Sequence, residues 1–192
     1  MHGVIFCELK SYVEKTLGLP MWMQITKEAN LNSKQYSGFR CYPDEELMNL
    51  IGTASRLTEI PVPALVESFG KYLGPILVQA RIHLYISGIH SCPVARPEWD
   101  LFDVISNTET MIHTIIHTAL PGSQPAFLDT KRNGQDEVKI VYTSKRKLCW
   151  LARGIVQGIS EHYKTLIEIT EPTCMHRGDA KCELVVRKLT VV

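Results

Sequence analysis

The sequence lacks an excess of either charge and lacks any long apolar run. Its 21 lysine and arginine residues nearly balance 20 aspartate and glutamate residues, which gives a formal net charge of +1 at pH 7. The basic residues form no long block, which argues against nucleic acid or an anionic membrane surface as the main partner. The longest apolar runs, such as Ile76-Leu77-Val78, are far shorter than a membrane-spanning helix requires.

Cysteine is also scarce. The chain has six cysteines in 192 residues, too few for a disulfide scaffold. The first residues, Met1 to Glu8, lack the basic start and the apolar stretch of a signal peptide. Together these absences favour a reducing cytoplasm as the location of the protein, where clustered cysteines indicate metal or redox chemistry.

What is present is the composition of one globular domain, with 45% hydrophobic and 21% charged residues. In the first half the apolar residues follow helical spacing, and Pro43 with the acidic residues after it is typical of a helix start. Leu19-Pro20 is expected to break the first helix, and Ile60 to Pro63 forms a stiff connector. Helices are predicted for residues 9–17, from Asp44 through Ile51, and for residues 64–72.

The second half changes character. A helical pattern begins at Leu101 and ends at the stop signal Pro121-Gly122. After it, alternating apolar residues predict strands, with a turn at 131–134 and one helix at 148–162. The strands are expected at 126–128, 137–146, 166–169 and 183–189. The fold class predicted by this order is α+β, helical at the N-terminal side and an antiparallel αβ arrangement at the C-terminal side.

Three polar side chains share the strand predicted at 137–146. On a strand, side chains alternate between faces, so Tyr142, Ser144 and Arg146 would point the same way. Arginine binds a carboxylate through two parallel contacts, and the two hydroxyls can donate to further oxygens. The pattern suits a ligand with paired carboxylates, or else it is the solvated face of an amphipathic strand.

The segment Tyr142-Thr143-Ser144-Lys145-Arg146 resembles the Tyr-x-Ser-x-Arg motif of H-NOX domains, the haem module shared with soluble guanylate cyclase. The resemblance extends along the chain, through the start at Met1-x-Gly3-x-Ile5-Phe6, Tyr42-Pro43-Asp44, Phe69-Gly70 and Leu120-Pro121-Gly122-x-x-Pro125-x-Phe127. It implies that Tyr142, Ser144 and Arg146 hold the propionates of a haem b. It also implies a helical subdomain over about 1–62 and a subdomain with a four-stranded antiparallel sheet over about 63–192, with haem between them.

The resemblance also selects one of seven histidines as the iron ligand. The family's proximal histidine lies eight residues before the proline that ends its helix, and His113 lies eight before Pro121. A neutral imidazole is a normal axial ligand of haem iron. His117, one turn later, is the second candidate. Without the resemblance, His113 would be interpreted as a core histidine, and a zinc site at spacing i, i+4 lacks the glutamate of a metalloprotease.

The residues expected around the gas are aliphatic. Some relatives hold oxygen with a tyrosine five residues after the motif arginine, and here that position is Leu151. Leu73 and Ile5 occupy the other expected distal positions, although all three could be ordinary core residues. The resemblance therefore implies a sensor of nitric oxide, which also binds carbon monoxide and does not retain oxygen.

Three cysteines form a further candidate site. Cys149, Cys174 and Cys182 resemble three zinc ligands of a subset of bacterial H-NOX proteins, and they are otherwise interpreted as buried thiols. The fourth ligand in that subset is a histidine, but here Glu171 stands at its position, so His176 is a second candidate. Without zinc the thiols could form a redox switch. Cys7, Cys41 and Cys92 have no partners by spacing.

The function implied by the resemblance is signalling rather than catalysis. Nitric oxide would weaken the bond between iron and His113, and the altered surface would act in trans on a histidine kinase or a cyclic-di-GMP enzyme. One rival is a V4R-like module for small hydrophobic ligands, and another is an interaction protein that senses through zinc or thiols. A peroxidase would need a distal acid–base group, and the expected distal positions are aliphatic.

Overall fold

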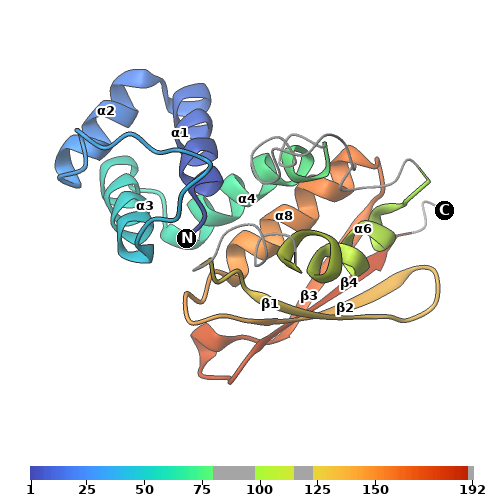
Figure 1. Cartoon of the computed structure of the whole chain (residues 1–192). Helices are drawn as coiled ribbons and strands as arrows, with labels where there is room; N and C mark the ends of the chain where they lie inside the picture. Colours follow the sequence, from blue (N-terminus) through green and yellow to red (C-terminus); the bar gives the residue numbers. More distant parts are fainter. Residues whose placement is uncertain (80–97, 115–122, 190–192) are drawn as a thin grey trace.

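The computed structural model describes residues 1–79, 98–114 and 123–189 (Figure 1). Within these ranges the chain has the α+β architecture expected, with helices first and a four-stranded antiparallel sheet after them. The helices are α1 Gly3–Leu17, α2 Leu19–Glu28, α3 Asp44–Thr58, α4 Val62–Val78, α6 Leu101–Thr108, the π-helical turn η1 Glu109–His113, α8 Cys149–His162 and the 3-10 turn η2 Met175–Arg177. The strands are β1 Phe127–Arg132, β2 Glu137–Thr143, β3 Ile167–Thr173 and β4 Cys182–Lys188.

Local sequence explains where the N-terminal helices begin. Pro43 caps α3, and three acidic residues occupy its first turn, as predicted. The prediction that Leu19-Pro20 breaks a helix needs a refinement, because α1 ends at Leu17 and Leu19 is the first residue of α2. Gly18, at φ 87°, makes the corner between them, and Pro20 fits the first turn of α2, where no backbone donor is required.

The sheet has the order β1-β2-β4-β3, and every neighbouring pair is antiparallel. Its buried face packs against α6 and α8, which lie over the sheet in Figure 1. The contacts are apolar and fully covered, with Val138, Ile140, Leu184 and Val186 from the sheet and Val104, Ile105, Val156 and Ile159 from the helices. This layer holds α6, and with it η1, in a fixed position above β1 and β2.

Three strand ends differ clearly from those predicted, and one of them is the end of β3, which continues to Thr173 instead of stopping at Ile169. β2 ends at Thr143, so the prediction of a strand to Arg146 was wrong. The chain turns at this point, where the Lys147 N–H donates to the Ser144 carbonyl at 3.2 Å and Lys147 adopts φ 52°. In the other direction, β1 continues to Arg132, so the turn predicted at 131–134 begins later and includes Gly134 at φ 71°.

Helices α4 and α8 are in backbone contact through glycines at i, i+4 spacing on both. A Cβ atom added to Gly154 would lie 2.0 Å from the Glu67 carbonyl oxygen, and one added to Gly158 would lie 2.1 Å from the Lys71 carbonyl oxygen. Gly70 and Gly74 meet α8 in the same way. The helices approach this closely because no side chain separates them.

Helix α4 also joins the two apolar cores. Its residues Val66, Phe69 and Leu73 pack with α1, α2 and α3, whereas Val78 packs with the sheet layer. The N-terminal helices are therefore attached to the rest of the domain largely through α4. In the part of the chain that the structure describes, no helix has both the length and the apolar character needed to cross a membrane.

The helix predicted from Leu101 onwards is present as far as it is described. α6 begins with a capping box between Asp100 and Asp103 and runs directly into η1. In η1 the Thr114 N–H donates to the Glu109 carbonyl, five residues back, which is the widened pattern of a π-helix. The predicted end at Pro121-Gly122, like His117 and Cys92, lies outside the described residues.

Candidate functional site

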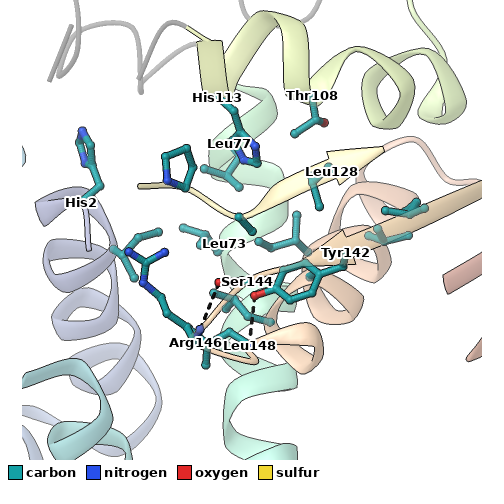
Figure 2. A pocket seen from close by; sticks show the side chains of 18 of the residues that line it. His2, Leu73, Leu77, Thr108, His113, Leu128, Tyr142, Ser144, Arg146 and Leu148 are labelled. Carbon is teal, nitrogen blue, oxygen red and sulfur yellow. Dashed lines mark hydrogen bonds between the residues drawn. The ribbon is translucent and has the colours of Figure 1, made fainter. Parts of the chain in front are cut away.

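A cavity of about 200 Å³ lies between the N-terminal helices and the sheet layer. Side chains from α1, α4, η1, α8 and the turn after β2 line it together (Figure 2). They include every residue predicted for the haem and gas site, namely Ile5, Leu73, His113, Tyr142, Ser144, Arg146 and Leu151. Residues separated by as many as 146 positions in the sequence, Ile5 and Leu151, thus meet in one place.

The walls of the cavity are largely aliphatic. Leu73 from α4 is fully buried, with 0% of its surface exposed, and Leu148 is 5% exposed. Leu77 and Ile155 extend the same apolar lining along α4 and α8. Such a surface favours an apolar ligand and disfavours water.

Polar groups gather where β2 ends. Tyr142 is 4% exposed, and its hydroxyl oxygen accepts a hydrogen bond from the Leu148 N–H at 3.1 Å (Figure 2). Burial raises the pKa of Tyr142, so the phenol keeps its proton and can donate it. The Ser144 hydroxyl accepts from the Arg146 N–H at 3.2 Å. The turn after Thr143, rather than strand alternation, is what brings these side chains together.

Arg146 reaches from this turn to the N-terminal helices. Its Nε lies 2.7 Å from the Asp44 Oδ2 in the first turn of α3, and its Nη1 donates to the Gln124 carbonyl. Burial works to raise the pKa of Asp44, but the pairing with Arg146 and with the Met1 ammonium outweighs it, and the pKa is lowered. The buried Arg146 Nε thus already faces the Asp44 carboxylate, so a ligand carboxylate would share this guanidinium with Asp44.

His113 enters the cavity from the opposite side, at the end of η1 (Figure 2). Its side chain is 15% exposed, and its Nδ1 lies 2.8 Å from the Glu109 Oε2. Because a carboxylate only accepts, Nδ1 is the donor, and the neutral ring keeps its lone pair at Nε2. This is the tautomer that a metal ligand bound through Nε2 requires.

Sequence reasoning missed two groups of this site, one that contacts His113 and one in the cavity wall. Glu109 was not singled out, because a glutamate four residues before a histidine is common on any solvated helix. His2 also lines the cavity, is 7% exposed, and accepts the Val4 N–H at its Nδ1 at 3.1 Å. Burial lowers the pKa of His2, and its buried Nε2 has no acceptor among the described residues. Nothing in the sequence distinguishes His2 from an ordinary helix cap.

The three predicted cysteines meet beneath the turn after β2. The Cys149 and Cys182 sulfurs lie 3.7 and 3.8 Å from the Cys174 sulfur, and all three residues are buried. One carboxylate oxygen of Glu171 joins them, and the four potential ligand atoms all lie within 4.8 Å of one another. Burial raises the pKa of Cys149 and of Cys182, and neighbouring thiols add to the effect on Cys149.

His176, the alternative fourth ligand, is turned away from this cluster. Its ring stacks on Trp150 with centroids 3.8 Å apart, and its Nε2 lies 2.7 Å from the Lys147 carbonyl. Glu171 is held in place by Arg177, whose Nη2 donates to the Glu171 carbonyl at 2.7 Å. Of the two candidates, the structure brings Glu171 to the thiols.

Comparisons with known proteins agree on one family. The family model described as haem-NO-binding matches residues 2–171. Among solved structures, the chain is similar to an H-NOX protein from S. oneidensis in the Fe(II)NO ligation state, with 22% identity over 99% of this chain and 100% of that chain and a TM-score of 0.84. An unliganded Fe(II) H-NOX protein from K. algicida has 17% identity over 100% and 98% of the two chains and a TM-score of 0.78. No curated protein matches the chain.

Proposed function

The chain belongs to the haem-NO-binding, or H-NOX, family, and on that basis we propose that it senses nitric oxide through one haem b bound in the cavity. Membership of the family implies haem-based gas sensing. We propose in addition that the gas is nitric oxide and that the iron ligand is His113. The observation that carries it is the composition of the cavity. Imidazole, hydroxyl and guanidinium groups face a single cavity whose lining is otherwise largely aliphatic.

This set of donors fits haem. A neutral imidazole with a free Nε2 lone pair suits iron, and a buried arginine with a tyrosine and a serine suits propionates. His113 and the Tyr142–Arg146 segment enter the cavity from different elements, and they would hold the iron and the propionates, respectively. When bound, haem would supply an iron centre that takes a diatomic gas.

The chain itself would convert a change at the His113 ring into a movement of α6. His113 is the last residue of η1, and η1 is continuous with α6. A change in how firmly the His113 ring is held therefore acts directly on α6, which packs on the sheet through Val104 and Ile105. Arg146 connects the same cavity to α3 through Asp44, so both halves of the domain respond.

The residues at the distal positions favour nitric oxide over oxygen. Ile5, Leu73 and Leu151 offer no hydrogen-bond donor, and bound oxygen gains more from a donor than nitric oxide or carbon monoxide does. We expect the purified ferrous protein to give spectra of nitric oxide and carbon monoxide complexes, and to give no persistent oxygen complex in air. Absorption spectroscopy measures all three.

Two results would contradict this proposal in different ways. A stable oxygen complex in air would show that the cavity supplies a donor and that the gas preference is wrong. A colourless protein that takes up no haem would favour the V4R-like interpretation, in which a small hydrophobic ligand fills the same cavity. The variant Leu151→Tyr adds a hydrogen-bond donor at the position where some relatives carry one. It tests whether such a donor allows the cavity to hold oxygen.

The remaining parts of the proposal concern signalling. We propose that the chain is a sensor rather than an enzyme and that it acts on a separate protein in the cytoplasm. A histidine kinase or a cyclic-di-GMP enzyme is the proposed partner. We further propose that the helical subdomain, about 1–62, moves against the subdomain of about 63–192, with the Asp44–Arg146 ion pair joining them.

For the cysteine cluster we propose a structural zinc ion held by Cys149, Cys174, Cys182 and Glu171. Tetrahedral zinc with bonds of about 2.3 Å places its sulfur ligands about 3.8 Å apart. The observed separations of 3.7 and 3.8 Å match that spacing and are far longer than the S–S bond of a disulfide, about 2.0 Å. The Met175 N–H donates to the Cys182 sulfur at 3.2 Å, which would support a thiolate at this position.

Elemental analysis tests the zinc proposal. Freshly purified, reduced protein is expected to contain about one equivalent of zinc, and Cys174→Ser is expected to lose at least about tenfold in zinc affinity, because its sulfur is central to the cluster. Cys41→Ser is the matched control, since Cys41 is exposed and free. If wild-type protein contains no zinc and all three thiols can be titrated, the three residues are ordinary buried cysteines and the zinc proposal is wrong.

A further inference from the structure

The Glu109 carboxylate joins the His113 ring to the sheet. Its Oε2 lies 2.8 Å from the His113 Nδ1, and the same oxygen accepts the Leu128 N–H at 2.9 Å. The side chains of Glu109 and His113 are largely buried, with 25% and 15% of their respective surfaces exposed. A carboxylate that bridges two donors in this way is fixed in position rather than free to rotate in solvent.

The secondary structure explains why the contact forms. β1 is an edge strand of the sheet and pairs only with β2 among the described strands, so its outer edge has backbone groups without strand partners there. Glu109 supplies an acceptor for one of them, at Leu128. The π-helical turn from Glu109 to His113 keeps the two side chains on the same side of the helix, between α6 and the cavity. Glu109 and His113 are therefore oriented together.

We propose that Glu109 is a positioning residue that sets how firmly His113 holds iron, an inference that rests on the proposed function. By accepting the proton at Nδ1, the carboxylate fixes the tautomer with a lone pair at Nε2. A carboxylate partner also makes the imidazole a stronger donor to metal than a neutral partner does. A stronger bond between iron and His113 would be harder for a bound gas to weaken. Glu109 would therefore set the threshold of the response to gas.

The test compares Glu109→Gln with wild type and with Asp129→Asn. Glutamine keeps an oxygen that can accept from both donors but removes the charge. Asp129 is exposed on β1 beside Leu128, so its variant removes one nearby charge without touching His113. In haem-free protein, nitrogen NMR of histidine reports the tautomer of His113. In haem-loaded protein, resonance Raman spectroscopy reports the iron–histidine stretch, and transfer to apomyoglobin reports the rate of haem loss.

We expect the wild-type ring to be protonated at Nδ1 before haem is added. In Glu109→Gln we expect the iron–histidine stretch to shift to lower frequency and haem loss to quicken about tenfold, the usual effect of removing a partner of a metal ligand. Asp129→Asn should behave as wild type. A wild-type ring protonated at Nε2, or an unshifted stretch in Glu109→Gln, overturns the proposal.

These outcomes are separable from failure of the proposed function. If wild-type protein binds no haem through His113, the Raman signal is missing in every variant, and the function itself is wrong. If wild type shows an iron–histidine stretch that Glu109→Gln leaves unchanged, the sensor function stands and only the role of Glu109 falls. The NMR measurement needs no haem and judges the Glu109–His113 contact even if the glutamine variant folds poorly.

Discussion

Replacing His113 with glycine is expected to remove haem from the purified protein, and added imidazole is expected to restore it. The substitution deletes the proposed bond between the chain and iron. Loss of a partner of a metal ligand lowers affinity by about 10–100-fold, so loss of the ligand itself should lower haem affinity by at least that much. The vacated space, with the Glu109 carboxylate at hydrogen-bond distance from the former Nδ1 position, fits a free imidazole. Haem per protein and the absorption spectrum measure both effects.

His117→Gly is the necessary comparison, because His117 is the second candidate from the sequence and lies outside the described residues. A distant control is His162→Gly, at the last turn of α8 and away from the cavity lining. Both should keep normal haem. Should His113→Gly keep its spectrum without imidazole while His117→Gly loses it, the assignment of the iron ligand is wrong.

Gly154→Ala is expected to destabilise the fold by about 2 kcal/mol. The new methyl would lie 2.0 Å from the Glu67 carbonyl oxygen and 3.0 Å from the Gly70 Cα, so α4 and α8 must separate. Overpacking of this kind costs about 1–3 kcal/mol or more, and the better helix propensity of alanine offsets about 1 kcal/mol. Because the obstacle is backbone, the upper range applies. For a domain of this size, a fall in Tm of about 4–8 °C follows.

Gly52→Ala provides the matched control with the opposite sign. Gly52 is exposed in the middle of α3, and a Cβ atom there would have no neighbour within 4 Å. The same change of residue should therefore stabilise the protein by about 1 kcal/mol. Thermal unfolding measures the Tm of both variants. Equal shifts in Tm would mean that the close contact between α4 and α8 makes no specific contribution to stability.

The parts of the fold that the sequence predicted well are those with local causes. Pro43 and the acidic turn after it mark the start of α3 because they act within a single helical turn. The end of β2 was mistaken because Ser144 and Arg146 continue the alternation of the strand although the backbone turns at Lys147. Alternation describes side chains, and it carries no information about where backbone pairing stops.

The site shows the same limit. The resemblance in motif identified the residues of the cavity, and the structure brings them together. The partners that the sequence did not indicate, Asp44 for Arg146 and Glu109 for His113, depend on geometry. The first joins residues from opposite halves of the chain, and the second is shaped by a π-helical turn. Neither has a pattern that separates it from an ordinary surface charge.

The cavity wall has a consequence for how the protein is made in the cell. Ile5 belongs to α1, which leaves the ribosome early, and Ile159 belongs to α8, which leaves it late, yet both line the same space. Synthesis adds about 5–20 residues each second, so the early helices wait many seconds with the glycine face of α4 uncovered. The pocket is incomplete until α8 has emerged and docked. The proposed haem cavity is therefore completed late in synthesis, and a chain truncated before Cys149 is expected to lack it.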